Sequence, residues 1–365
     1  MDYYKKYNLK EVINASGKMT ALGVSKYSEE TISAQKFAGQ HFFVMDELVR
    51  NTGKYIADLV GTEDAHIVSA ASSGIAQTVA GIIGQGDQYH AYHPYSDKIK
   101  KREIILPKGH NVDYGTSVEV MVQTGGGKVV EAGYANMCHK DHVEMMITEE
   151  TAAILYIKSH HTVQKSMLSI EDAVEVAHKN NLPLILDAAA EQDLFKYSAA
   201  GADLTIYSGA KAFEGTSSGL VIGKAPFVEW TRLQSKGIGR AMKIGKENIL
   251  GLTTAIENYI KTGAELGESM KARLAPFVKN LNEIEHISSS VVQDGAGRDI
   301  FRAKVVIEKS SPLNAVKVLE QLKAGNPAIY SRDYQANNGI IEFDIRAVNE
   351  KEMGQIVTRL REILK

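Results

Sequence analysis

The stretch that decides the fold runs from Thr151 to Gly209. It contains three apolar runs, "TAAILYIKS" (Thr151–Ser159), "LPLILDAAA" (Leu182–Ala190) and "ADLTIYSG" (Ala202–Gly209). Short, continuous apolar runs bounded by polar or turn-forming residues are typical of strands buried on both faces. The sequence therefore predicts three buried strands here.

A helix is predicted between the first two of these strands, in "SIEDAVEVAHKNN". Ser169 is its expected N-cap and Asp172 completes a capping box. One helical face is apolar and consists of Ile170, Ala173, Val174 and Ala177. Buried strands that alternate with capped amphipathic helices indicate an α/β fold with a mostly parallel central sheet, covered on both faces.

The pattern along the chain divides it into domains. Residues 51–245 are expected to form a large α/β domain. Residues 246–365 read as a smaller α+β C-terminal domain, with alternating runs such as "RAKVVIE" and a closing helix from about Glu350. Residues 1–50 are expected to be an N-terminal segment that packs on these domains.

The composition narrows the function classes. The chain has 365 residues, with 42 Lys and Arg against 44 Asp and Glu, so the net charge is −2. This balance lacks the excess of positive charge that proteins use to bind the phosphates of nucleic acids. Cys138 is the one cysteine, which excludes an internal disulfide and a cysteine-built metal site and suits a reducing cytosol. No signal peptide or membrane span is apparent. We expect a soluble cytoplasmic protein with no nucleic-acid or membrane partner and no bound metal.

A candidate phosphate site lies in "IVSAASSGIAQTVAGIIG" (Ile67–Gly84), where an apolar run ends in serines and a glycine before a helix. Free backbone N–H groups and the positive end of the helix dipole favour an anion at such a place. Ordinary N-capping by Ser72 or Ser73 is the alternative.

Two further residues could carry chemistry. Asp187 ends the strand "LPLILD", where open α/β sheets bind their ligands, although a helix cap or a structural ion pair would explain it equally well. Lys211 lies 24 residues further on, in "YSGAKAFEGTSSG" (Tyr207–Gly219). A single lysine is usually a solvated surface residue. A buried lysine among small residues can instead lose its proton and form a Schiff base. Phosphate cradle, carboxylate and lysine together are what pyridoxal 5'-phosphate (PLP) requires.

The motifs "SAASSGIAQ", "LPLILDAAAEQD" and "ADLTIYSGAKAFEGTSSGLVIG" make the chain resemble the fold type I PLP enzymes, whose fold is that of aspartate aminotransferase. It is most similar to the group that contains selenocysteine synthase (L-seryl-tRNA selenium transferase) and D-glucosaminate-6-phosphate ammonia-lyase. "VINASGKMTALG", "GGGKVVEAG" and "NPAIYSRDYQANNGIIEFDIRAV" extend the resemblance over residues 9 to 350.

The resemblance assigns roles to particular residues. It makes Lys211 the Schiff-base lysine and Asp187 the partner of the pyridinium nitrogen. The cofactor phosphate would be bound by Ser72, Ser73, Gly74 and Ser208. His110 or Tyr114 would stack on the cofactor ring, and the sequence leaves this choice open. Arg346 is the first candidate for the substrate carboxylate and Arg332 the second, although both could be surface ion-pair residues.

The resemblance also implies a reaction. A PLP-dependent ammonia-lyase would remove the Cα proton of a 2-amino-3-hydroxy sugar acid, namely D-glucosaminate 6-phosphate, and expel the β-hydroxyl. The products would be 2-keto-3-deoxy-6-phosphogluconate and ammonia. Conceivable contacts for the substrate phosphate are Lys18, His161 and Lys165. A homodimer or higher homo-oligomer is also implied, since a neighbouring subunit commonly completes such sites.

Three alternatives remain open at this point. One is a transferase acting on seryl-tRNA, which the slightly negative charge and a family pattern beginning by residue 12 disfavour. Another is a different PLP-dependent lyase or aminotransferase. The third, from a different class, is a catalytically silent PLP-fold binding protein or an unrelated α/β binding protein.

The segment "TGGGKVV" (Thr124–Val130) lacks the glycine spacing of a nucleotide-binding loop and is interpreted as a turn that caps the C-terminus of a helix.

Overall fold

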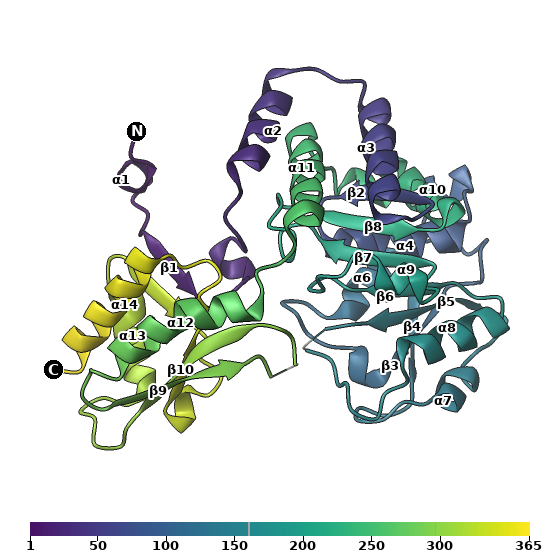
Figure 1. Ribbon diagram of the computed structural model, residues 1–365. Helices are drawn as coiled ribbons and strands as arrows, with labels where there is room; N and C mark the ends of the chain where they lie inside the picture. The colour runs from purple at the N-terminus through teal and green to yellow at the C-terminus, as the bar shows by residue number, and fades with distance from the viewer. Residues whose placement is uncertain (160, 296) are drawn as a thin grey trace. The chain divides into compact units, whose positions relative to one another are not determined.

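The structure is a computed structural model that describes residues 1–159, 161–295 and 297–365. It forms two compact units (Figure 1). The larger unit is Tyr27–Gly263, and the smaller unit combines Met1–Lys26 with Ala264–Lys365.

The larger unit is built on a seven-stranded sheet with the strand order β2-β8-β7-β6-β5-β3-β4. Strand β8 is antiparallel to its neighbours β2 and β7, and the other pairs are parallel. The expected mostly parallel sheet is therefore confirmed. The strands are β2 (Asp64–Val68), β3 (Glu103–Pro107), β4 (Lys128–Ala132), β5 (Thr151–Ile157), β6 (Leu184–Asp187), β7 (Leu204–Ser208) and β8 (Gly219–Gly223).

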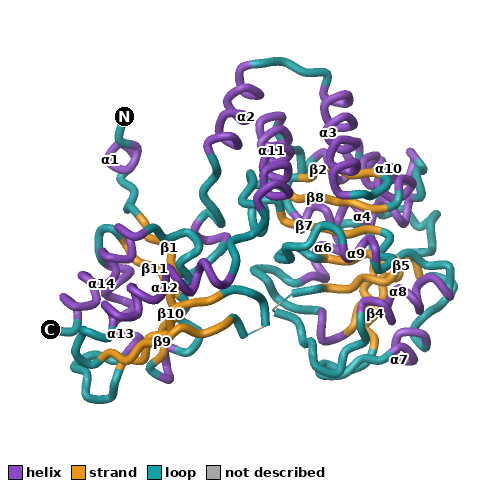
Figure 2. Tube along the Cα trace, viewed as in Figure 1, coloured by secondary structure: helices purple, strands orange, loops and turns teal. Residues whose placement is uncertain are grey.

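Helices flank the strands of this sheet (purple and orange in Figure 2). The α-helices of the larger unit are α2 (Glu29–Gln40), α3 (Met45–Val60), α4 (Ala71–Gly84), α5 (Gln88–Tyr92), α6 (Val118–Thr124), α7 (Lys140–Glu144), α8 (Ile170–Lys179), α9 (Lys196–Ala199), α10 (Ala225–Leu233) and α11 (Lys246–Thr262). Short 3-10 helices are η2 (Lys108–His110), η3 (Gln234–Lys236) and η4 (Ile238–Arg240).

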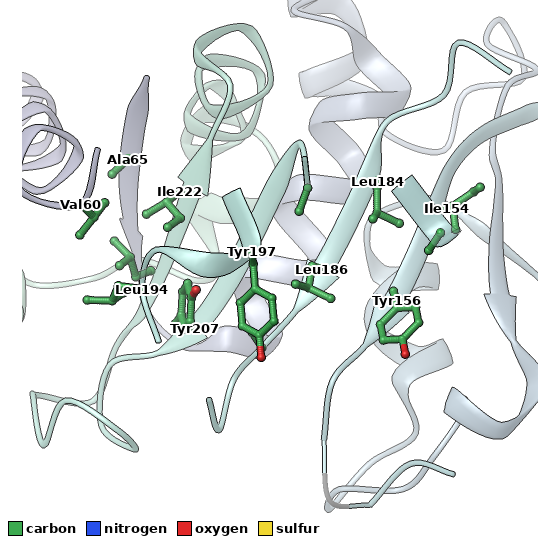
Figure 3. Packing of buried hydrophobic residues seen from close by; sticks show 14 of the residues in the cluster. Val60, Ala65, Ile154, Tyr156, Leu184, Leu186, Leu194, Tyr197, Tyr207 and Ile222 are labelled. Carbon is green, nitrogen blue, oxygen red and sulfur yellow. The ribbon is translucent and has the colours of Figure 1, made fainter. Parts of the chain in front are cut away.

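Side-chain alternation along the strands creates two apolar cores, one on each face of the sheet. On β5, Ile154 and Tyr156 belong to one core while Leu155 and Ile157 belong to the other. Helices α3, α8 and α11 pack on the first core, which Figure 3 shows from close by, and α4, α6 and α10 pack on the second. The sheet is thus buried on both faces, which leaves its strand ends as the places where polar groups can gather.

Local sequence signals explain individual elements. The Ser169 hydroxyl accepts the Asp172 N–H at 3.0 Å, and the Asp172 carboxylate accepts the Ser169 N–H at 3.2 Å, so the expected capping box starts α8. The glycines after α6 form the expected C-cap turn into β4, with Gly126 at φ +81°.

The smaller unit is α+β. A three-stranded antiparallel sheet has the order β12-β10-β9, and β1 pairs in parallel with β11. Three helices, α12 to α14, bury an apolar core against these strands. The elements are α1 (Tyr3–Tyr7), β1 (Val12–Ala15), η1 (Thr20–Leu22), α12 (Gly267–Leu281), β9 (Ile287–Gln293), β10 (Phe301–Ile307), α13 (Ala315–Ala324), β11 (Ala328–Ser331), η5 (Ala336–Asn338), β12 (Ile340–Phe343) and α14 (Glu350–Ile363).

The unit boundaries differ from those expected from sequence texture. Helix α11 was expected in the C-terminal domain, but Leu252 and Ile256 on it are buried in the core of the larger unit. The first 50 residues are also divided, because β1 pairs with β11 in the smaller unit whereas α2 and α3 belong to the larger one. Within the described residues, no helix is both long enough and apolar enough to cross a bilayer.

Candidate active site

The larger unit brings three predicted segments to one end of its sheet. Asp187 closes β6 and pairs with Ile206 on β7. Two residues later on β7, Ser208 donates its N–H to Ala189 O at 3.2 Å and pairs with Gly219 on β8. A Cβ on Gly219 would lie 2.5 Å from the carbonyl carbon of Ala70, at the start of α4. The aspartate, the lysine turn after β7 and the start of helix α4 therefore share this strand end.

Asp187 is a buried carboxylate with a perturbed pKa. Burial raises the pKa of Asp187 to about 6, while the Ala189 N–H, which its Oδ1 accepts at 3.0 Å, and the Lys211 charge act in the opposite direction. Its side chain is 8% exposed. A buried carboxylate that is costly to ionise gains from a nearby cation, such as a protonated ring nitrogen.

Lys211 lies in a tight turn directly after β7. Its N–H donates to Ser208 O at 3.3 Å, and the side chain is half-buried. Two alanines, Ala210 and Ala212, flank it and are buried. Gly209 fixes the turn, because a Cβ there would contact the Ser218 hydroxyl and lie 2.6 Å from Leu252 Cδ1 on α11. The backbone that carries the lysine is therefore held by its neighbours on β8 and α11.

The start of α4 uses its serines in different ways. The Ser73 hydroxyl donates to Ala70 O at 2.8 Å and accepts the Ala70 N–H at 2.9 Å, so it closes the first turn of its own helix. The Gly74 N–H is also used inside the helix, on Ala70 O at 3.0 Å. Ser72 is only half-buried. The first N–H groups of a helix have no intrahelical acceptor, so the backbone of Ala71 to Ser73 can hold an anion.

His110 and Tyr114 differ in access. His110 has no exposed surface, meets the edge of Tyr156 at 4.5 Å between ring centroids, and accepts the Ile157 N–H on Nδ1 at 3.4 Å. Burial lowers the pKa of His110 to about 4, so its ring is neutral. Stacking of His110 on a cofactor would require its neighbours to move. Tyr114 is 38% exposed, and burial, then the nearby Asp187 charge, raise its pKa to about 12.

The carboxylate candidates lie in the smaller unit. Arg346 makes a bidentate pair with Asp344, with Nε to Oδ1 at 2.9 Å and Nη2 to Oδ2 at 2.7 Å. Burial alone would raise the pKa of Asp344, but Arg346 and Arg302 together hold it at about 2. Arg332 lies 3.6 Å from Glu342 Oε2 and covers the Tyr334 ring at 5.0 Å.

The remaining sequence candidates have weaker structural support. His161 is exposed beyond the end of β5, with its N–H donated to Ser159 Oγ at 3.2 Å. Lys165 is exposed, and Lys18 lies in the smaller unit. Among the residues that the structure describes, no group of three or more His, Cys, Asp or Glu could hold a metal ion.

Sequence reasoning missed two features of these sites. Asp344, two residues before Arg346, was not recognised as its partner, because the chain turns after β12 and a turn has no periodic pattern that pairs side chains. The proximity of Tyr114 to Asp187 had no signal in the sequence, because a loop without periodicity gives no register.

Comparison with known proteins places this geometry in a family. The model for L-seryl-tRNA selenium transferase (SelA) matches residues 96–294. The chain is 45% identical to D-glucosaminate-6-phosphate ammonia lyase of Salmonella typhimurium over 99% of this chain and 97% of that protein.

The chain belongs to the SelA family.

Other members and solved structures extend this assignment. A 5'-C-glycyluridine monooxygenase-decarboxylase of a Streptomyces species is 33% identical over 99% of this chain and 92% of its own length. A solved structure of D-glucosaminate-6-phosphate ammonia-lyase superposes with a TM-score of 0.94, at 45% identity, over 100% of this chain and 98% of that chain. Aspartate aminotransferase from Thermus thermophilus shares the fold, with a TM-score of 0.53 at 13% identity, over 99% of this chain and 93% of that one. The expected SelA-family membership and aspartate aminotransferase fold are both confirmed.

Proposed function

We propose that this SelA-family chain is a PLP-dependent ammonia-lyase that converts D-glucosaminate 6-phosphate to 2-keto-3-deoxy-6-phosphogluconate and ammonia. The observation that carries the proposal is the placement of Asp187, Lys211 and the start of α4 at one strand end. The full-length identity of 45% to D-glucosaminate-6-phosphate ammonia lyase supports the substrate.

The described residues fit the cofactor. Asp187 is buried and its pKa is raised, so a positively charged pyridinium nitrogen beside it would favour the ionised carboxylate. The backbone N–H groups of Ala71 to Ser73, with the Ser72 and Ser208 hydroxyls, would hold the phosphate. Ser73 and Gly74 would then act by shaping the start of α4. The amine of Lys211 would hold the cofactor covalently by forming a Schiff base with the aldehyde of PLP.

The reaction needs one base and one leaving group. When bound, PLP supplies an electron sink for the charge that develops at Cα. Lys211 would act as the base that takes the Cα proton on Nζ. The Cβ–O bond would then break, and the hydroxyl group would leave with one proton as water. Hydrolysis of the remaining enamine would consume one water and release the keto acid and ammonia, so no water is gained or lost overall.

Other residues would position the substrate and cofactor. Arg346 would bind the substrate carboxylate through its guanidinium, with Arg332 as the second candidate. His161 would contact the substrate phosphate. We assign the ring-facing aromatic position to Tyr114 in place of His110, because Tyr114 is accessible and near Asp187.

We also propose a homodimer or a higher homo-oligomer. Large apolar side chains are exposed around the connection between α2 and α3, with Phe42 fully exposed and Val44 68% exposed. Apolar surface gathered in this way indicates a protein interface. Sedimentation at micromolar concentration should show a multiple of the 39.9 kDa chain. A Phe42→Ser variant should shift toward monomer, and a wild-type protein that sediments only as monomer would refute the proposal.

The activity test uses PLP-loaded protein and D-glucosaminate 6-phosphate. Ammonia and keto acid should appear in equal amounts. Lys211→Ala should lose this activity by several orders of magnitude, while Lys309→Ala, which changes an exposed lysine in a turn of the smaller unit, should retain it. Loaded protein that turns over another β-hydroxy amino acid and not this one would reject the substrate while keeping the cofactor assignment.

A further inference from the structure

The Arg346 guanidinium is held rigidly from one side. Its Nε and Nη2 donate to the two oxygens of Asp344, and its backbone N–H lies 3.3 Å from Oδ1. Asp344 is completely buried, and its own N–H is fixed on Ala15 O at 2.8 Å. A planar guanidinium bound along one edge is held in a defined orientation, and a guanidinium of fixed orientation suits the recognition of a carboxylate.

Behind Asp344 lies a row of alternating charges. Arg302, only 2% exposed, reaches Asp344 Oδ2 with Nε at 3.2 Å and Asp294 Oδ1 with Nη1 at 2.8 Å. Arg298 Nε pairs in turn with Asp294 Oδ2 at 2.9 Å. These five side chains carry three positive charges and two negative ones.

The N-terminal loop packs on the same pair. Gly17 has φ +97°, and a Cβ there would lie 3.0 Å from Asp344 Oδ2 and 3.4 Å from Arg346 Nη2. Asn14 holds this loop, since its Nδ2 donates to Gly17 O at 2.9 Å and its Oδ1 accepts the Ser16 N–H at 3.0 Å. A side chain at position 17 would press on the ion pair and strain the backbone.

We propose that Asp344 is a positioning residue that orients Arg346 toward the substrate carboxylate, with Arg302 supporting it from behind and Gly17 allowing the N-terminal loop to close over the pair. The inference deepens the proposed function and rests on the assignment of Arg346 to the substrate carboxylate. The inference gives the "NASGKM" loop a role in substrate selection. The loop helps to set the direction of the Arg346 guanidinium, and this guanidinium would distinguish an acid from an alcohol or an aldehyde.

The test compares two ligands that cannot react because they lack the amine. 6-Phospho-D-gluconate carries both carboxylate and phosphate, and D-glucitol 6-phosphate carries the phosphate alone. Their affinities for the PLP-loaded enzyme are measured by titration calorimetry. Asp344→Asn should weaken 6-phospho-D-gluconate about tenfold or more, as expected for a disturbed charged hydrogen bond, and leave D-glucitol 6-phosphate within about twofold. In turnover, KM should rise more than kcat falls.

Asp333→Asn is the matched control, because it makes the same change at an exposed aspartate that pairs with Lys323 at 3.1 Å. It should leave both affinities unchanged. Equal weakening of both ligands by Asp344→Asn would show a merely structural role and overturn the proposal. Unchanged binding of 6-phospho-D-gluconate would overturn it as well.

Arg346→Ala separates this inference from the function on which it rests. If Arg346→Ala weakens 6-phospho-D-gluconate while Asp344→Asn does not, only the positioning role fails. If Arg346→Ala binds both ligands normally, Arg346 is not the carboxylate residue, and both assignments fall. Should Asp344→Asn not fold, Gly17→Ala tests the same pair with all charges kept. It should cause the same selective loss, and unchanged selectivity in Gly17→Ala would overturn the proposal.

Discussion

Asp187 and Lys211 lie within each other's electrostatic field, on neighbouring strand ends of the larger unit. The lysine charge lowers the pKa of the carboxyl, yet burial dominates and leaves that pKa near 6, above the ordinary value of 3.8. Burial therefore disfavours the ionised carboxylate by more than the lysine charge favours it. A second cation beside Asp187, namely the pyridinium nitrogen of PLP, would favour the ionised carboxylate and so explain why a carboxylate is buried here.

This relationship predicts the pH dependence of stability without cofactor. A carboxyl whose pKa is higher in the folded than in the unfolded protein stabilises the fold fully below pH 3.8, and this stabilisation is lost as the pH rises through about 6. The loss amounts to roughly 3 kcal/mol at most. Asp187→Asn should therefore stabilise the cofactor-free protein at pH 7.5 and make little difference near pH 4.

Thermal unfolding of the two cofactor-free proteins at both pH values measures this effect. The same variant should bind PLP more weakly, because a neutral amide cannot stabilise the pyridinium charge. An Asp187→Asn protein that is less stable than wild type at pH 7.5 would show that the carboxylate is already satisfied in the fold.

Substitution of the two serines at the start of α4 should have different effects, on protein stability for Ser73 and on PLP binding for Ser72. Ser73→Ala removes the hydroxyl that closes the first turn onto Ala70, so it should cost about 1 kcal/mol of unfolding free energy, as other helix caps do. Ser72→Ala should leave the unfolding free energy nearly unchanged and weaken PLP binding. Urea unfolding of the cofactor-free variants and a PLP titration give the two quantities, and the reverse pattern would reassign the phosphate contact to Ser73.

Gly209 should tolerate no side chain. A Cβ there would overlap the Ser218 hydroxyl and crowd Leu252, so Gly209→Ala should cost about 1–3 kcal/mol and displace the turn that carries Lys211. Gly39→Ala is the control, since Gly39 lies in α2 with nothing within 4 Å of its Cβ position. It should stabilise the protein by up to about 1 kcal/mol. Equal stability of the Gly209→Ala protein and wild type in urea would contradict the close approach.

The aromatic residues near the site give a further prediction. Tyr114→Ala should weaken PLP binding and shift the visible absorption of the loaded protein, with little loss of stability because Tyr114 is 38% exposed. His110→Ala should instead lower the unfolding free energy by about 2 kcal/mol or more, since it opens a cavity at a fully buried position. A normal absorption spectrum for Tyr114→Ala with an altered one for His110→Ala would return the ring-facing role to His110.

The sheet was predictable from sequence because its signals are local and repeated. Continuous apolar runs identified β5, β6 and β7, and the Ser169–Asp172 capping box marked the start of α8. Asp187 and Lys211 could be singled out because each directly follows a buried strand, and strand ends of a parallel sheet are where ligands gather.

Tertiary partners were not predictable in the same way. Helix α11 has a helical pattern whichever unit it packs on, so its sequence could not place it in the larger unit. The Ser73 hydroxyl had two possible acceptors, a ligand or its own helix, and only three-dimensional structure distinguishes them. His110 and Tyr114 are both aromatic residues that follow β3, and the burial of His110 depends on contacts with β5 that have no periodic signature.

Borohydride reduction of the PLP-loaded protein, followed by peptide mass spectrometry, tests the central claim most directly. The account predicts a visible absorption band that disappears on reduction and one modified peptide, with the reduced cofactor on Lys211. The Lys211→Ala protein should retain no covalent cofactor. Attachment to another lysine, or covalent cofactor on Lys211→Ala, would contradict the assignment of this strand end as the active site.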